Sequence, residues 1–246
     1  MLVNRASAGQ NGHPMARRYR CDPLPAPGPF RLAGDLAHHL VQVMRIRPGA
    51  ELVLFDGHGS ECEVVVDAAG RQHVQGVASP ARAATREPPT ALEVAFAIPK
   101  GARAEWLFEH GTEVGIRVFQ PLRTARAVPF APERIERWRR IVAAAAGQCD
   151  RAFVPEVRDA ITLTELVQRR DLPAARFVAA AHGRPAARAG AASSLLAVGP
   201  EGGFTAAEDT ELQQAEFVPV SLGALTLRTE TAVLAGAVLL LAGAAG

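Results

Sequence analysis

The sequence contains few cysteines, and their spacing excludes two common kinds of stabilising site. Cys21, Cys62 and Cys149 are the only three, and they are too far apart to form a CxxC pair or a disulfide framework. A structural zinc site is therefore not predicted, and no residue pattern calls for a catalytic metal. Free thiols are typical of a reducing compartment, so we predict a cytoplasmic protein.

Long apolar runs are also missing, although 48% of the 246 residues are hydrophobic. No run reaches the length of about 18 residues that a membrane-spanning helix needs. Residues 1–14 are polar and lack the apolar core of a secretory signal, so we interpret them as a disordered tail. The composition therefore predicts a globular protein with a sizeable core and no membrane partner.

Lysine is almost absent, and the formal net charge is only +2. Arginine supplies nearly all of the positive charge, because Lys100 is the only lysine. Arginines recur in the N-terminal part of the chain, where they would either follow a phosphate backbone or form a solvated surface. The candidates for RNA contact there are Arg17, Arg18, Arg45 and Arg47.

The N-terminal part has the pattern of short strands separated by turns. A Pro48-Gly49 turn precedes the alternating run at residues 51–55, and a glycine-rich turn follows at residues 56–59. Several short strands with regularly spaced turns are typical of a small β-barrel or sheet. We therefore predict an all-β domain over residues 15–80.

A different pattern begins after a segment of proline, alanine, threonine and charged residues. We assign residues 81–90 to a linker because this segment has no periodicity. Over residues 91–246, apolar runs typical of strands alternate with helical segments, including helices predicted at residues 102–114 and 132–146. This alternation predicts an α/β domain with a mostly parallel sheet.

Capping patterns predict the start of two further helices. Thr162 is followed three residues later by Glu165, and Thr205 is followed in the same way by Glu208. In such a capping box, each side chain binds the backbone N–H of the other residue.

The most informative segment is GPEGG at residues 199–203, between the apolar run LLAV and the Thr205 capping pattern. Glycines at the end of a strand allow a tight turn and a close approach of the backbone to a ligand. The carboxyl ends of parallel strands are the usual ligand-binding edge of an α/β sheet. The segment matches neither a dinucleotide fingerprint nor a P-loop, and a turn without function is the alternative interpretation.

A second informative segment is LGALTLRTET at residues 222–231. Leu222 and Gly223 form another predicted turn at a strand end. Arg228, Thr229 and Glu230 lie where the last helix begins, and polar groups at such a position are suited to binding a polar substrate. The alternative is a simple helix cap in which Thr229 is the capping residue.

Together, these two segments resemble the small-subunit ribosomal RNA uridine-N3 methyltransferases, a family within the trefoil-knotted SPOUT class. The similar stretches span nearly the whole chain from Met15 and include HHLVQVMRIRPGAELVLFDG, IPKGARAEWLFEHGTEVGI, AVGPEGGFTAAE and LGALTLRTETA. The resemblance implies a PUA-like RNA-binding β-barrel over residues 15–80. It also implies a methyltransferase domain over residues 91–246, with a parallel sheet and a last segment that passes through a loop as a knot.

The resemblance further implies a cofactor and partners. The cofactor would be S-adenosylmethionine, the partner would be ribosomal RNA or the small ribosomal subunit, and the protein would be a homodimer. By matching positions, the cofactor pocket would be lined by Ala181, Val198, Gly199, Pro200, Gly202, Gly203, Leu222, Gly223 and Leu227.

The implied reaction transfers a methyl group from S-adenosylmethionine to N3 of a uridine in small-subunit ribosomal RNA. Arg228, Thr229 and Glu230 are the implied catalytic residues. Arg228 would stabilise charge on a carbonyl oxygen of the base. Glu230 would either accept the proton or position Arg228, and we favour the positioning role. Lys100 and Arg151 would either contact RNA phosphates or pair with carboxylates.

The sequence departs from the family pattern at two positions. Leu225 and His110 stand where the family commonly has a basic residue and a lysine, respectively. The alternatives are a knotted methyltransferase that acts on another RNA nucleotide, a non-catalytic RNA-binding protein, and an enzyme with a phosphate loop. The last lacks support because no Lys-Ser/Thr pair follows the glycines.

Overall fold

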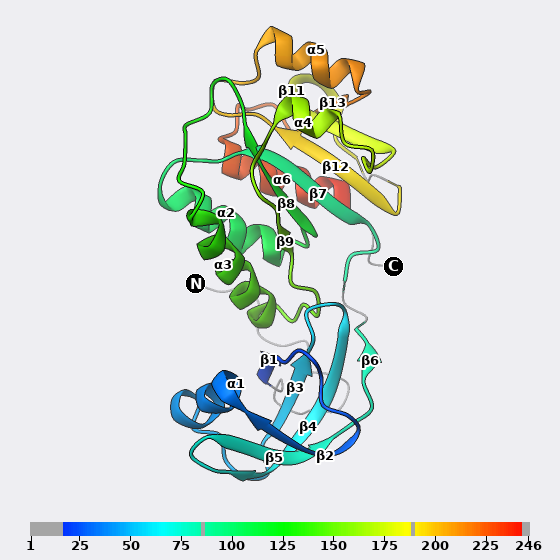
Figure 1. The fold of residues 1–246 in the computed structure, drawn as a ribbon. Helices are drawn as coiled ribbons and strands as arrows, with labels where there is room; N and C mark the ends of the chain where they lie inside the picture. Colours follow the sequence, from blue (N-terminus) through cyan, green and yellow to red (C-terminus); the bar gives the residue numbers. More distant parts are fainter. Residues whose placement is uncertain (1–16, 85–86, 188–189, 243–246) are drawn as a thin grey trace. The chain divides into compact units, whose positions relative to one another are not determined.

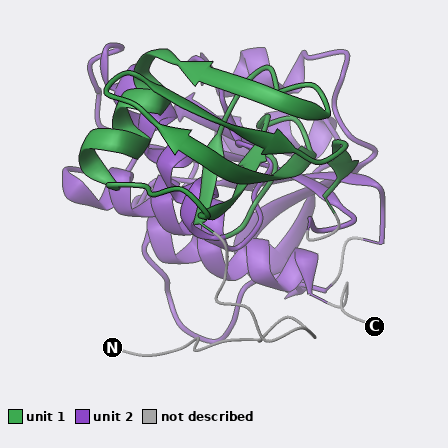
Figure 2. Cartoon of the chain, turned by 90° about the horizontal axis from the view of Figure 1, so that it is seen from below, with its two compact units in different colours: residues 1–86, 150–153 green, residues 87–149, 154–246 purple. Residues whose placement is uncertain are grey.

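The computed structural model describes residues 17–84, 87–187 and 190–242, which belong to two compact units. Unit 1 is Met1–Arg86 with Asp150–Phe153, and unit 2 is Glu87–Cys149 with Val154–Gly246 (Figure 2). The boundary at residue 86 lies inside the predicted linker. The assignment of residues 150–153 to unit 1 was not predicted, and the predicted tail at residues 1–14 lies outside the described residues.

Unit 1 is built on one six-stranded sheet, in the order β1-β3-β4-β5-β2, with β6 paired to β4. The β1–β3 pair is parallel and the other pairs are antiparallel. β6 lies within residues 81–90, so part of the predicted linker is a strand. The strands are β1 (Arg17–Arg20), β2 (Gly28–Ala33), β3 (Glu51–Phe55), β4 (Ser60–Ala69), β5 (His73–Ala78) and β6 (Arg82–Ala83).

Unit 1 also contains helical turns within a part of the chain for which the sequence analysis predicted only strands and turns. α1 (Gly34–His38) continues directly into η1 (His39–Val43), a π-helix. Ala37 and Leu40 are buried on this segment, and their spacing of three residues is helical rather than alternating. They pack in one core with alternating side chains of the sheet, including Leu52, Leu54 and Val64.

Unit 2 is an α/β domain whose strand pairings are all parallel in the described part, as the sequence predicted. The sheet order is β10-β8-β7-β12-β11-β13, and β9 pairs with β8. The strands are β7 (Ala91–Ala97), β8 (Val118–Arg123), β9 (Glu156–Val157), β10 (Ile161–Thr162), β11 (Ala175–Pro185), β12 (Ser193–Val198) and β13 (Val218–Ser221).

Helices cover both faces of this sheet (Figure 1). Leu92, Val94 and Phe96 of β7 pack with the helices of one face, and Ala95 packs in the core of the other face. Strands buried on both faces are typical of parallel sheets. The first face is covered by α2 (Ala102–Glu113), α3 (Arg134–Gln148) and α6 (Thr229–Leu241), and the second by α4 (Leu163–Val167) and α5 (Ala206–Gln214).

The local start signals of the helices are largely confirmed. Both capping boxes form, at Thr162 with Glu165 and at Thr205 with Glu208. α2 and α3 lie within two residues of their predicted bounds. No helix in the described ranges is long and apolar enough to cross a membrane.

Two glycines permit close packing around β11, β12 and β13. A Cβ atom at Gly183 would lie 2.5 Å from the backbone nitrogen of Val220, so β11 and β13 approach closely at this position. A Cβ atom at Gly236 would lie 2.4 Å from Cδ2 of Leu196, so α6 packs directly on β12. Any residue larger than glycine at either position would clash with these neighbouring atoms.

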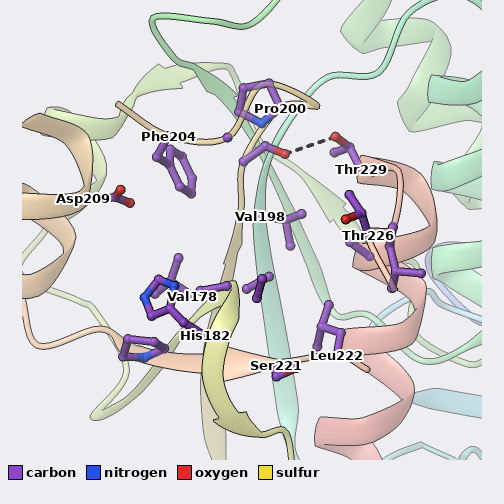
Figure 3. Close-up of a pocket in the computed structure, with 18 of the residues that line it drawn as sticks. Val178, His182, Val198, Pro200, Phe204, Asp209, Ser221, Leu222, Thr226 and Thr229 are labelled. Atoms are coloured by element: carbon purple, nitrogen blue, oxygen red, sulfur yellow. Dashed lines mark hydrogen bonds between the residues drawn. The ribbon is translucent and has the colours of Figure 1, made fainter. Parts of the chain in front are cut away.

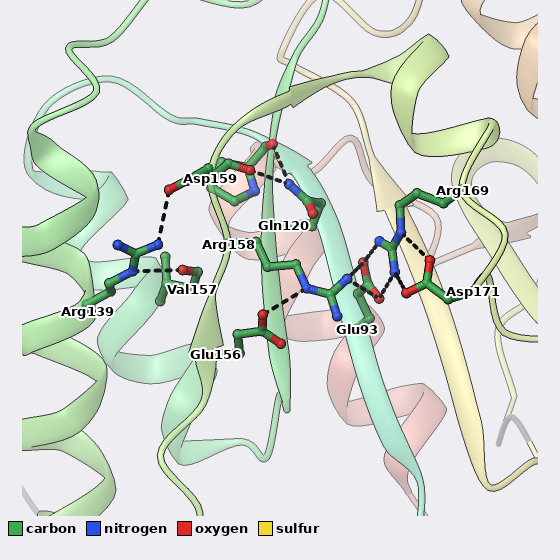
Figure 4. Close-up of polar contacts among 10 residues, drawn as sticks. Glu93, Gln120, Arg139, Glu156, Val157, Arg158, Asp159, Arg169 and Asp171 are labelled. Atoms are coloured by element: carbon green, nitrogen blue, oxygen red, sulfur yellow. Dashed lines mark hydrogen bonds and ion pairs between the residues drawn. The ribbon is translucent and has the colours of Figure 1, made fainter.

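A buried ion-pair network forms around Glu93, near the start of β7 (Figure 4). The carboxylate of Glu93, whose side chain is 8% exposed, pairs with both Arg158 and Arg169. Arg169 in turn pairs with Asp171 at 2.9 Å. A buried carboxylate needs such partners because its desolvation is costly.

Candidate functional site: a cavity at the carboxyl ends of three parallel strands

A cavity of about 610 Å³ lies where β11, β12 and β13 end (Figure 3). These neighbouring strands are parallel, so their carboxyl ends meet at one edge of the sheet. The walls come from the middle of β11, the GPEGG turn (residues 199–203) after β12, the helix α5, and the loop between β13 and α6.

Eight of the nine residues predicted for the cofactor pocket line this cavity: Ala181, Val198, Gly199, Pro200, Gly203, Leu222, Gly223 and Leu227. Gly202 is not a lining residue, and this part of the prediction is not supported. A Cβ atom at Gly202 would lie 3.3 Å from Cδ of Arg126, on the side of the turn that faces the loop after β8.

The GPEGG turn is held in place by the loop that follows β8. Nη1 of Arg126 donates to the carbonyl oxygens of Gly202 at 2.7 Å and Phe204 at 3.2 Å. Oε1 of Glu208 accepts a hydrogen bond of 2.9 Å from the N–H of Ala125, while its Oε2 closes the capping box. The turn is therefore fixed before any ligand binds, which is the geometry of a preorganised site.

Gly203 has the left-handed backbone conformation that this turn requires, with φ of 69°. Its N–H donates to the carbonyl oxygen of Pro200 at 2.8 Å, which closes the turn. Phe204, whose ring lies against Gly199, forms part of the cavity wall.

The N-terminus of α6 contacts this turn directly. The hydroxyl of Thr229 donates to the carbonyl oxygen of Gly199 at 3.1 Å (Figure 3). Thr229 therefore does not cap α6: the N-cap residue is Arg228, and no side chain binds the free N–H groups there. Leu225, in the loop before α6, is 81% exposed at the cavity.

Glu230 is buried and pairs with an arginine that the sequence analysis did not select. Its Oε1 lies 3.7 Å from Nη1 of Arg103 on α2, and the same Nη1 lies 3.4 Å from Oε1 of Glu201 in the GPEGG turn. In the described part of the chain, Glu230 forms no ion pair with Arg228, which is exposed. The preferred hypothesis that Glu230 positions Arg228 is therefore not supported by this structure.

The candidates for RNA contact in unit 1 fall into two groups. Arg17, Arg45 and Arg47 are exposed. Arg18 is not: its side chain is 9% exposed and pairs with Glu61 at 2.9 Å. Arg151 is only 5% exposed. The side chains of Arg18 and Arg151 are therefore less accessible to a phosphate than those of the other candidates.

In unit 2, Lys100 is exposed and lies two residues before the start of α2. The residues that sequence reasoning missed are Arg103, Arg126, Glu201 and Phe204. Their positions in the sequence give little signal, because only the fold brings α2 and the loop after β8 to the GPEGG turn. Glu201 was inside a selected motif, and its charge next to the glycines was the available signal.

Comparison with known families follows the division into two units. The model of the RNA methyltransferase domain matches residues 86–241. The model of the RNA methyltransferase PUA domain matches residues 32–78. The chain therefore belongs to the RNA methyltransferase family that these two domains define.

Several similar proteins are named ribosomal RNA small subunit methyltransferase E. The ribosomal RNA small subunit methyltransferase E of Bacillus subtilis is 32% identical over 83% of this chain and 86% of its own length. The protein of the same name from Mycobacterium bovis is 36% identical over 89% of this chain and 88% of its own length. The crystal structure of a ribosomal RNA small subunit methyltransferase E from Neisseria gonorrhoeae, bound to S-adenosyl methionine, has a TM-score of 0.80 and 27% identity. The match covers 90% of this chain and 95% of the Neisseria gonorrhoeae chain.

Proposed function

We propose that this protein transfers a methyl group from S-adenosylmethionine to N3 of a uridine in small-subunit ribosomal RNA. One observation carries the proposal: the two segments most specific to the resemblance meet at one cavity, joined by the bond from Thr229 to Gly199. The names of the relatives support the cofactor and the ribosomal RNA. The choice of N3 rests on the sequence resemblance alone.

The cavity fits this cofactor in chemistry as well as in size. Its walls are largely apolar, as an adenine ring requires, and include Val178, Val198 and Leu222. The charged lining residues are the carboxylates Glu201 and Asp209, and no lysine or arginine lines the cavity in the described part of the chain. An acidic wall suits a ligand that carries a sulfonium cation. When bound, S-adenosylmethionine supplies the methyl group from that sulfonium.

The chain's own residues would align the base and stabilise its charge. In the reaction, the N3–H proton leaves to water, N3 bonds to the methyl carbon, and the bond between methyl carbon and sulfur breaks. Arg228, exposed at the N-cap of α6, stabilises negative charge on a carbonyl oxygen beside N3. Thr229 holds the turn against α6, and Glu230 has a structural role because its carboxylate is buried.

The same proposal includes a knotted path and a homodimer. The close packing of α6 on β12 at Gly236, and its bond to the GPEGG turn, support a chain end that passes through this region. The exposed arginines Arg17, Arg45 and Arg47 of unit 1 would contact RNA phosphates, together with Lys100 of unit 2.

The test is a methyl-transfer assay with labelled S-adenosylmethionine on small ribosomal subunits that lack the modification and on free ribosomal RNA. After digestion to nucleosides, mass spectrometry identifies the product. We expect N3-methyluridine. We also expect Arg228→Ala to lower kcat by about a hundredfold, the usual cost of losing one oxyanion donor, while the Kd of S-adenosylmethionine stays within about twofold by calorimetry.

Other products would assign other functions. A methylated ribose or another methylated base would place the protein among knotted methyltransferases with a different acceptor. Binding of RNA without any transfer, on either substrate, would support the non-catalytic alternative. Full activity of the Arg228→Ala variant would remove this arginine from the mechanism.

A further inference from the structure

We propose that Arg103 is a second arginine that binds the target base, and that Glu201 and Glu230 are its positioning residues. The inference rests on the proposed function and assigns a role to three residues whose contacts only the fold reveals. It also replaces the role first expected for Glu230, because this carboxylate faces Arg103 rather than Arg228.

The three residues come from segments that are far apart in the sequence. Arg103 lies in the first turn of α2, Glu201 in the GPEGG turn and Glu230 in the first turn of α6. Both carboxylates approach the same nitrogen, Nη1 of Arg103, at 3.4 and 3.7 Å. A long side chain held from two directions loses little entropy when it binds a further group.

Burial separates Arg103 from Glu230, one of the two carboxylates that hold it. The side chain of Glu230 is 8% exposed, and its Oε2 atom is buried without a hydrogen-bond partner in the described part of the chain. The side chain of Arg103 is 37% exposed. Arg103 is therefore accessible to a substrate, whereas Glu230 is enclosed and does not serve as a base that the substrate reaches.

The guanidinium retains unused donors. Within the described residues, the carboxylates that pair with Arg103 approach Nη1, and neither Nε nor Nη2 donates a hydrogen bond to the protein. A guanidinium carries five N–H donors in a fixed planar fork. The edge formed by Nε and Nη2 is therefore available to an oxygen of the ligand.

The local charge indicates which oxygen this is. Two carboxylates share one guanidinium, so the cluster carries a net charge of about −1 and attracts a phosphate poorly. A directed N–H donor still stabilises an oxygen on which charge develops only during the reaction. When uracil loses its N3 proton, negative charge spreads to O2 and O4, one on each side of N3. The proposal assigns one of these oxygens to Arg228 and the other to Arg103.

A double-mutant cycle tests this assignment. Arg103→Ala, Glu230→Gln and the double variant are assayed for kcat, for KM of RNA and for Kd of S-adenosylmethionine. We expect Arg103→Ala to lower kcat by about a hundredfold with the cofactor Kd nearly unchanged, and the double variant to be no worse than Arg103→Ala. The matched control is the surface pair Arg137 and Glu105, at 2.8 Å on α3 and α2, for which Arg137→Ala should change kcat by less than about twofold.

Chemical rescue distinguishes the loss of the Arg103 guanidinium from a structural defect of the Arg103→Ala variant. Guanidinium ion at low millimolar concentration should restore part of the activity of Arg103→Ala, and ammonium at the same concentration should not. Arg103→Lys should remain impaired, because an ammonium has no planar fork to divide between carboxylates and substrate. Thermal unfolding of each variant shows whether it is folded.

Several results would overturn the inference. Multiplicative effects of Arg103→Ala and Glu230→Gln would mean that Glu230 acts independently, as a base would. A normal kcat with a weakened cofactor Kd would mean that Arg103 only supports the GPEGG turn. Absence of methyl transfer by the parent protein would instead reject the proposed function, and this inference with it.

Discussion

The hydroxyl of Thr229 donates a hydrogen bond of 3.1 Å to the carbonyl oxygen of Gly199, two residues that lie 30 positions apart. Thr229 is 3% exposed, so water does not replace this bond. The contact joins the first turn of α6 to the turn after β12, and both residues line the cavity. This buried hydroxyl is therefore one of the groups that fix the shape of the cavity, together with the Arg126 side chain that holds the other side of the turn.

Replacing Thr229 with valine tests this dependence, because valine keeps the shape and removes the hydroxyl. A buried carbonyl left without its donor costs about 1–2 kcal/mol of unfolding free energy. We expect that loss in urea unfolding, and a rise of about fivefold in the Kd of S-adenosylmethionine because the turn is less well held. Thr231→Val, at an exposed position of the same helix, is the control. A stability loss with an unchanged Kd would separate the bond from cofactor binding.

Two glycines of the GPEGG turn provide a matched pair for locating the ligand. Gly199 lines the cavity, and a Cβ atom there would lie 3.3 Å from the Phe204 ring. At Gly202, which does not line it, the Cβ atom would lie 3.3 Å from the flexible side chain of Arg126. Neither glycine has a left-handed φ, so a valine at either position adds bulk rather than backbone strain.

We expect Gly199→Val to weaken S-adenosylmethionine binding by at least about tenfold in calorimetry, because added methyl groups displace Phe204 into a packed site. Gly202→Val should bind within about threefold of the parent, since the Arg126 side chain can move. Equal losses in both variants would indicate that the whole turn, and not the cavity, determines affinity.

What the sequence predicted well depends on contacts between near neighbours. The capping boxes at Thr162 and Thr205 form because their partners are three residues away. The turn at Gly199 follows from a strand that ends in glycines. The parallel sheet follows from alternation of strands and helices, and the PUA assignment followed from resemblance.

What the sequence missed depends on contacts between distant segments. Nothing near Arg103 or Arg126 indicates that the fold carries both to the GPEGG turn. Arg18 and Arg151 resembled solvated arginines until the fold buried them. Residues 34–43 are helical because Ala37 and Leu40 pack onto the sheet, a tertiary cause that the surrounding strand pattern concealed.

The different exposure of the candidates for RNA contact leads to a direct comparison between Arg47 and Arg18. Arg47 is exposed, so Arg47→Gln should lower the slope of log K against log salt for RNA binding by about 1, without a change in stability. Arg18→Gln leaves the carboxylate of Glu61, 12% exposed, without this partner, and should cost about 3 kcal/mol of stability. Filter binding at several salt concentrations, with urea unfolding, distinguishes the two. A lowered salt slope for Arg18→Gln would return Arg18 to the RNA surface.

The network around Glu93 should matter for stability rather than for catalysis. Glu93→Gln leaves Arg158 and Arg169 without the buried charge that they share (Figure 4). Removing one partner of a buried pair costs about 3 kcal/mol or more. We expect that loss in urea unfolding at pH 7, with kcat unchanged under conditions in which the variant is folded. A loss below about 1 kcal/mol would mean that the pair is effectively solvated.

The stability contributed by the same network should depend on pH through the carboxylate of Asp171. The hydrogen bond from Arg169 lowers the pKa of Asp171 from 3.8 to about 2. Because the pKa is lower in the folded state than in the unfolded state, the contribution is fully present above pH 4 and is lost as the pH falls toward 2. Its carboxylate is 68% exposed, so solvent limits the contribution to below about 1 kcal/mol. Urea unfolding should show Asp171→Asn slightly less stable than the parent at pH 7, with a smaller difference at pH 3. A difference that grows on acidification would contradict the folded-state pKa.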